Sequence, residues 1–105
     1  AAAVRTLKSY IVHTHAKDGI MVQPHDPREV YGLLPEDPPG LFPKRQGKLY
    51  EEVPLGAGKV DWAAYLKALE EIGFRGYLTI EREVGAAPAA DIRKAVQFLR
   101  QKSGA

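Results

Sequence analysis

Hydrophobic positions recur most regularly in the second half of the chain, where they predict two amphipathic helices. Asp61 is a favourable helix N-cap, and Gly73 is typical of a helix C-terminus. The residues between them that recur at helical spacing are Trp62, Tyr65, Leu66, Leu69 and Ile72. Proline is favoured at the first position of a helix, so Pro88 opens the last helix. The apolar stripe of that helix consists of Ile92, Ala95, Val96 and Leu99.

Two further segments have the pattern of β-strands. Residues 76–81 alternate, with Leu78 and Ile80 on one side and Glu81 on the other. Residues 10–15 are aromatic and β-branched and predict a buried strand after the end of a helix at residues 4–9. Because alternate residues of an extended chain share a face, His13, His15 and Lys17 point to the same side. This pattern is typical of a site, or of two histidines packed in a core.

The middle of the chain is irregular. Six of the eight prolines fall within residues 19–48, which we predict to be a long loop or lid. Residues 26–31 have the pattern of one helical turn, with Asp26 as cap and Pro27 at its first position. Residues 49–54 predict a brief strand that ends at Pro54.

The order of elements is therefore strand, long loop, helix, strand, helix, within a single segment that covers residues 1–105. Two strands joined through a helix are expected to be parallel, which makes this a βαβα unit of the α/β class. A parallel sheet of two strands leaves two open edges, and two helices cannot cover both faces. The sequence therefore predicts part of a larger α/β barrel, or copies that assemble to close a sheet.

Composition and charge exclude several classes of protein. Fifteen lysines and arginines oppose thirteen aspartates and glutamates, and the basic residues are scattered, which argues against a nucleic-acid surface. No apolar run approaches the length of a membrane span, so we expect a cytoplasmic protein without a membrane partner. The chain has no cysteine, so any metal must be held by histidine, carboxylate or carbonyl groups.

Three motifs in this order resemble one enzyme superfamily. HTHAKD lies at the end of the first strand, PLGAGKVDW leads into a helix, and GYLTIERE contains the second strand. Together they resemble the sugar phosphate isomerases and epimerases, which are xylose isomerase-like TIM barrels related to endonuclease IV. The resemblance covers about residues 10–99 and implies the C-terminal two βα units, strands seven and eight with their helices, of a (β/α)8 barrel. By itself such a piece is incomplete, because eight units need about 250 residues.

The resemblance also implies the site residues. His15 and Glu81 would be metal ligands, completed by a Glu and an Asp from earlier strands of the barrel. One nitrogen and three carboxylates favour manganese, with cobalt, magnesium or zinc as alternatives. Glu81 would also be the catalytic acid/base that transfers a proton through an enediolate of a sugar or sugar phosphate. His13, Lys17 and Asp18 are the candidate substrate-binding residues.

Each assignment has a structural alternative. His13 could equally support His15 or pack, Asp18 could belong to a plain turn with Gly19, and Arg82 and Glu83 are expected to be solvated or paired within a loop. The glycines of Gly56-Ala57-Gly58 fit no phosphate-binding fingerprint and predict a tight turn.

Two other functions compete with the isomerase. Glu52 stands where endonuclease IV-like members carry a zinc-binding histidine, so three-zinc phosphodiester chemistry is disfavoured. The second rival is a non-catalytic fragment that self-associates or binds without turnover. We expect the isolated chain to be inactive unless the missing N-terminal barrel segment, or self-association, completes the site.

Overall fold

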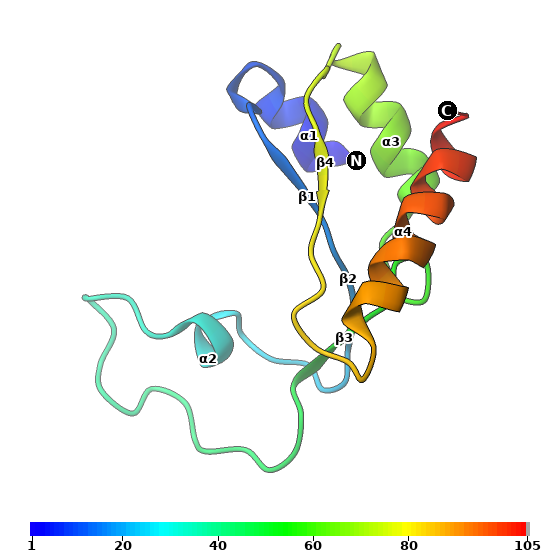
Figure 1. Cartoon of the computed structure of the whole chain (residues 1–105). Coiled ribbons are helices and arrows are strands. Elements are labelled where there is room, and N and C mark those ends of the chain that lie inside the picture. The colour runs from blue at the N-terminus through cyan, green and yellow to red at the C-terminus, as the bar shows by residue number, and fades with distance from the viewer. Residues whose placement is uncertain (105) are drawn as a thin grey trace.

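The computed structural model describes residues 1–104 and shows a mixed α/β chain (Figure 1). Its helices are α1 (Ala2–Leu7), the 3-10 turn η1 (Lys8–Tyr10), α2 (Arg28–Tyr31), α3 (Trp62–Glu71) and α4 (Pro88–Ser103). Its strands are β1 (Thr14–Ala16), β2 (Asp18–Met21), β3 (Tyr50–Val53) and β4 (Leu78–Ile80).

The first sheet pairs β1 with β4 in parallel. His15 is the partner of Thr79 and Ala16 is the partner of Ile80, and beyond the strands the Glu81 N–H donates to the Ala16 carbonyl over 3.1 Å. Helix α3 lies between these strands in sequence and α4 follows them, so the expected parallel βαβα order is confirmed.

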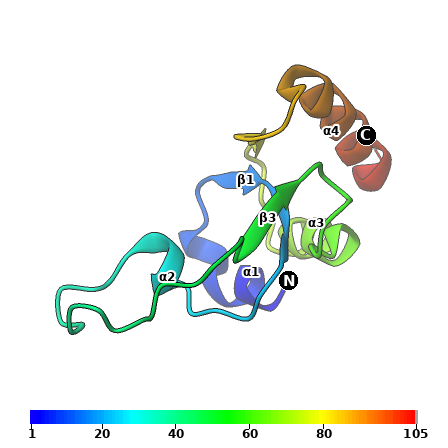
Figure 2. The same ribbon diagram turned by 90° about the horizontal axis from the view of Figure 1, so that it is seen from below.

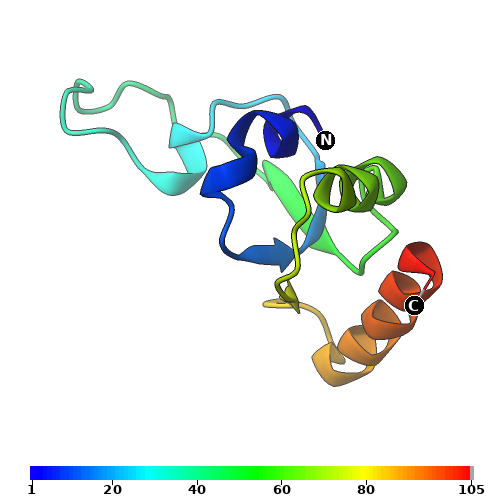
Figure 3. The same ribbon diagram turned by 90° about the horizontal axis from the view of Figure 1, so that it is seen from above.

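One face of this sheet is covered by helices. Thr14 and Ala16 are buried, and Ala16 packs in a cluster with Trp62 of α3 and Leu99 of α4. A second cluster joins α1 to α3. Figure 3 shows α3 and α4 on one side of β1 and β4. His15 lies between two buried neighbours and is exposed, so it occupies the face that these helices leave open.

Both parallel strands are shorter than predicted. Of the strand predicted at residues 10–15, only its last two residues belong to β1, and Tyr10 lies in η1. Tyr10 and Val12 are 83% and 87% exposed, so the prediction that they are buried was wrong. The strands are short because hydrogen bonds join them only between residues 14–16 and residues 78–80. Within the described residues 1–104, residues 10–13 have no strand partner.

Only one strand of the second sheet was predicted: β3 confirms the brief strand expected at residues 49–54. Residues 18–21, expected to begin the long loop, form β2 and pair antiparallel with β3. The Asp18-Gly19 pair looked like a turn, but Gly19 lies opposite Glu52, and a side chain at position 19 would meet the Glu51 carbonyl at 3.1 Å. The absence of a side chain therefore lets the two strands approach closely.

The remaining loop, residues 22–49, projects away from α3 and α4 as an arm (Figure 2). It contains the predicted helical turn, as α2, but Pro27 and not Asp26 is the N-cap, so the cap prediction was wrong by one residue. The Asp26 carboxylate accepts the Arg28 N–H over 2.9 Å. Two ion pairs within the arm join Arg28 to Asp37 at 2.7 Å and Arg45 to Glu29 at 2.9 Å. These contacts connect the arm mainly to itself.

Asp18 joins the two sheets to the start of α3. Its side chain is buried and accepts hydrogen bonds from Trp62 Nε1 at 2.8 Å and from the N–H groups of Gly56 and Val60 at 2.9 and 3.2 Å. A side chain at Gly58 would collide with the Asp18 carboxylate, so the glycines predicted to form a tight turn wrap around this group.

Replacing Asp18 tests this structural role. Asp18→Asn removes the charge and places an NH2 group among N–H donors, so the free energy of unfolding should fall by about 1–3 kcal/mol. Urea denaturation measures it. The matched control is Asp61→Asn at the N-cap of α3, where Asn caps as well as Asp and the change should stay within about 0.5 kcal/mol. Equal effects of the two substitutions would contradict the role of Asp18.

Candidate functional site

His15 and Glu81 lie together at the carboxyl ends of the two parallel strands. The His15 Nδ1 atom is 3.2 Å from Glu81 Oε1, and both side chains are partly exposed, at 49% and 32%. His15 is held by the pairing of β1 with β4, and Glu81 by its N–H bond to Ala16. The two predicted metal ligands are therefore neighbours on the face that α3 and α4 leave open.

Lys17 lies next to this pair. Its Nζ atom is 3.7 Å from Glu81 Oε2 and 3.2 Å from Glu52 Oε2, and it also donates to Glu83. The hydrogen bond to Glu83, together with that to Glu52, outweighs burial and raises the pKa of Lys17. Lys17 is therefore a fixed positive charge beside the Glu81 carboxylate.

His13 packs against His15. Their ring centroids are 5.0 Å apart in an edge-to-face arrangement, and His13 Nε2 is 3.4 Å from Thr79 Oγ1. This contact limits how the His15 ring can turn. The structure thus brings four of the five predicted site residues together, namely His13, His15, Lys17 and Glu81.

Asp18 is the exception. Its carboxylate faces the turn before α3. Both oxygens accept hydrogen bonds from N–H groups of this turn, of Gly19 and of Trp62. Burial opposes its ionisation, but the hydrogen bonds from Trp62, Val60, Gly56 and Gly19 prevail and lower the pKa of Asp18. These bonds give Asp18 a structural role, and its contact with substrate stays a prediction.

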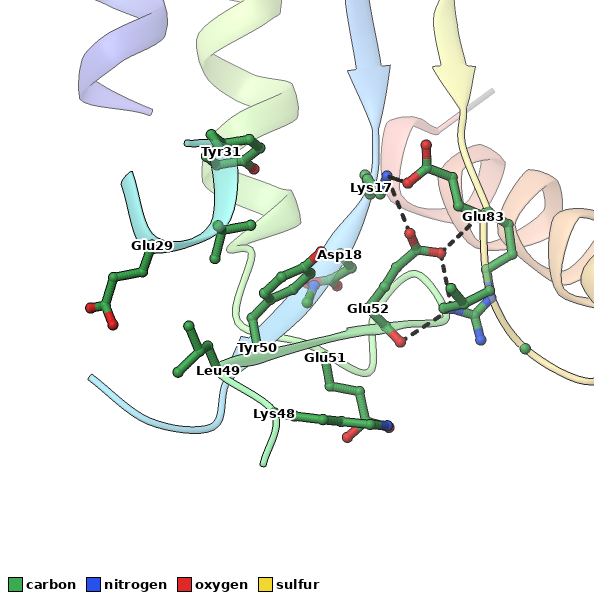
Figure 4. Close-up of a pocket in the computed structure, with 15 residues that line it drawn as sticks. Lys17, Asp18, Glu29, Tyr31, Lys48, Leu49, Tyr50, Glu51, Glu52 and Glu83 are labelled. Atoms are coloured by element: carbon green, nitrogen blue, oxygen red, sulfur yellow. Dashed lines mark hydrogen bonds and ion pairs between the residues drawn. The ribbon is translucent and has the colours of Figure 1, made fainter. Parts of the chain in front are cut away.

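A buried charge network next to the candidate site joins Glu52, Arg82 and Asp91. Arg82 is paired rather than solvated: its side chain is 8% exposed, with Nη1 3.1 Å from Glu52 Oε1 and Nε 2.8 Å from Asp91 Oδ2. Glu52 also accepts the Glu83 N–H over 3.0 Å (Figure 4). Glu52 thereby joins β3 to both Lys17 and the segment that follows Glu81.

This network was not predicted from the sequence. Arg82 stands between two glutamates, which indicates local pairing, while its partners Glu52 and Asp91 lie 30 and 9 residues away. The signal available in the sequence was the predicted strand itself. Neighbouring residues of a strand point to opposite faces, so one of Glu51 and Glu52 had to face inwards.

An open cleft of about 980 Å³ adjoins the charged cluster. It lies between α2 of the arm, β3 and the segment 82–85, and Figure 4 shows Tyr31 and Tyr50 along it. Lys17 and Glu83 line the cleft, whereas His15 and Glu81 lie just outside it. The cleft is therefore a neighbour of the candidate metal ligands and does not contain them.

The geometry of His15 and Glu81 fits part of a metal shell. Adjacent ligands of an octahedral ion at about 2.1 Å lie about 3 Å from each other, close to the observed 3.2 Å. Within residues 1–104, however, no group of three histidine or acidic side chains is arranged to hold a metal ion. These residues therefore supply half of a site at most.

The structure is therefore a mixed α/β chain with two candidate ligands at the carboxyl ends of its parallel strands. The sequence profile of the xylose isomerase-like TIM barrel family matches residues 1–102, so the chain belongs to this family. The family includes sugar isomerases and epimerases as well as endonuclease IV-like enzymes. The resemblance drawn from the three motifs is confirmed at the level of the superfamily.

No curated protein and no solved structure significantly matches the chain. Among the helices of residues 1–104, none is both long and apolar enough to span a membrane.

The charge network predicts a pH dependence of stability. Burial opposes ionisation of Glu52, but hydrogen bonds from Lys17, Arg82 and the Glu83 N–H prevail and lower its pKa. A lowered pKa stabilises the fold above the ordinary carboxyl pKa of about 4, and this stabilisation is lost as the pH falls through the folded-state value. Glu52→Gln should therefore lower the melting temperature at pH 7, and its difference from the unmutated chain should narrow towards pH 3.

The measurement is thermal unfolding at pH 7, 5 and 3. The control is Glu70→Gln, on the exposed side of α3, which should differ little from the unmutated chain at each pH. A difference for Glu52→Gln that stays constant from pH 7 to pH 3 would show that its charge contributes nothing.

Proposed function

We propose that this chain forms the C-terminal two βα units of a TIM barrel, with β1 and α3 as the seventh unit and β4 and α4 as the eighth. The barrel would be a divalent-metal-dependent isomerase or epimerase of a sugar or sugar phosphate. The observation that carries the proposal is the 3.2 Å approach of His15 to Glu81 at the carboxyl ends of two parallel strands. Active sites of TIM barrels lie at that end of the strands.

His15 and Glu81 would hold the cation, with manganese as the first candidate and cobalt, magnesium or zinc as alternatives. A bound divalent cation would polarise the substrate carbonyl and stabilise the negative charge that develops on it. His13 would keep the His15 ring in place, since the two rings are in contact.

Glu81 would transfer the proton. Its Oε1 atom faces His15, whereas Oε2 faces Lys17 at 3.7 Å. A carboxylate in this position can accept a proton from the carbon next to the carbonyl and return it to the neighbouring carbon. For an epimerase, a second carboxylate from the rest of the barrel would deliver a proton to the other face. The ammonium of Lys17, 3.7 Å from Glu81 Oε2, would bind a substrate oxygen.

The rest of the barrel would supply the other ligands. The described chain has an accessible surface of 7813 Å², whereas a compact protein of its mass exposes about 5,800 Å². Its radius of gyration is 16.2 Å, against about 13 Å for a compact domain of this length. This excess surface supports a partner that covers the open face, either the remaining barrel strands or further copies of the chain.

Metal binding tests the half-site directly. Calorimetric titration of manganese into the chain should give binding that weakens at least tenfold in His15→Ala and in Glu81→Gln, because each removes one ligand. His25→Ala is the matched control, since His25 lies on the arm against the Gln23 carbonyl. Equal weakening by all three substitutions, or manganese binding that ignores His15, would contradict the assignment. The oligomeric state should be recorded on the same sample.

Proton exchange tests the enzymatic proposal. Where self-association or the remaining barrel strands complete the site, a ketose with manganese in D2O should exchange the hydrogen on the carbon next to its carbonyl for deuterium, which NMR detects. The isolated chain without such completion should be inert. Glu81→Gln should slow this exchange by about 10²–10⁴-fold without unfolding the chain, while Glu70→Gln should leave it unchanged. Absence of exchange by the completed site, with metal and a broad panel of sugars, would contradict the enzymatic proposal.

A further inference from the structure

The side chains that line the cleft beside the half-site indicate which class of substrate could enter it. It shares Lys17 with the charged cluster around Glu81, so it is the nearest cavity for the part of a substrate that is remote from its carbonyl. Any role of the cleft in substrate selection rests on the proposed function, because it takes Glu81 as the reacting end.

Lys17 and Arg82, which line the cleft, are already paired, and the third basic residue, Lys48, is a 72% exposed side chain beside Glu51. Lys17 contacts three carboxylates, Arg82 contacts Glu52 and Asp91, and Lys48 lies 3.6 Å from Glu51. A phosphate group entering the cleft would have to compete with these carboxylates for each cation. No ready-made anion site is therefore present among the cleft residues.

The charge of the lining is negative. Three basic residues face five acidic ones, which gives a formal charge of −2. The acidic residues are Asp18, Glu29, Glu51, Glu52 and Glu83. The side chains of Glu51 and Glu83 are 45% and 68% exposed and can accept hydrogen bonds from a ligand. A phosphate dianion would be repelled by this field, whereas hydroxyl groups would find acceptors.

Two tyrosines complete the lining. Tyr31 is 89% exposed and Tyr50 is 53% exposed, and both lie along the cleft in Figure 4. An aromatic ring with a hydroxyl offers an apolar face and a polar edge, a combination that suits a sugar ring with its C–H groups and hydroxyls. The cleft thus offers ring faces beside its charged groups.

We infer that the cleft binds the hydroxylated end of an uncharged sugar, on Tyr50 and the exposed carboxylates, and that it excludes phosphate esters. This choice follows from the paired cations and the excess of carboxylates. Of the two substrate classes in the proposed function, sugars and sugar phosphates, it selects the sugars.

The test is an NMR titration of the full chain with D-fructose and, separately, with D-fructose 6-phosphate. Fructose should shift the amide signals of Tyr50, Glu51 and residues 82–85. The dissociation constant of the phosphate ester should be at least roughly tenfold higher than that of fructose. Equal or tighter binding of the ester, or no shift of the cleft signals by fructose, would overturn the inference.

Two pairs of variants sharpen the result. Tyr50→Ala should weaken fructose binding, whereas Tyr10→Ala, on an exposed tyrosine outside the cleft, should not. Glu51→Lys brings the lining to neutrality and should strengthen binding of the ester, whereas Glu36→Lys on the arm should have no such effect. Equal behaviour within either pair would overturn the inference.

Turnover separates this inference from the proposed function. Fructose that binds in the cleft but never exchanges its proton would support the cleft assignment and contradict the proposed enzyme. Exchange with phosphate esters alone would support the enzyme and overturn the cleft assignment.

Discussion

The parallel register of β1 and β4 is the constraint on which the candidate site depends. Only three residue pairs define it, yet it sets His15 beside Thr79, and one further hydrogen bond fixes Glu81 beyond Ala16. Because partners in a parallel sheet share a face, a slip of one residue would turn either His15 or Glu81 towards the helices. The burial of Thr14 and Ala16 against Trp62 and Leu99 opposes such a slip.

Two buried acids brace this register from neighbouring segments. Asp18 collects N–H groups from the turn before α3 and from Trp62, so it fixes the chain directly after β1. Glu52 binds Lys17 and Arg82, so it fixes the segments that follow both parallel strands. Each carboxylate is hydrogen-bonded within the chain, so the antiparallel sheet of β2 and β3 supports the segments that carry the candidate site.

The sequence predicted the regular elements better than the contacts between them. The N-cap at Asp61 and the proline at position 88 mark the starts of α3 and α4 because capping is a local property. The extent of β1 and the existence of β2 depend on partners distant in sequence, at residues 78–80 and 50–53, so local patterns misplaced the first and missed the second. The proximity of His15 and Glu81 could be predicted because strand parity and family motifs agree. Arg82 instead pairs with distant residues that no local pattern reveals.

The central claim is that His15 and Glu81 form one metal-binding half-site, and paramagnetic broadening by manganese tests it most directly. When manganese is added in small amounts to the isotope-labelled chain, the NMR signals of His15, Thr79 and Glu81 should broaden first, while those of His25 on the arm stay sharp. Broadening that begins at Glu51 and Glu83 in the acidic cleft, or that spreads evenly over the chain, would contradict the half-site.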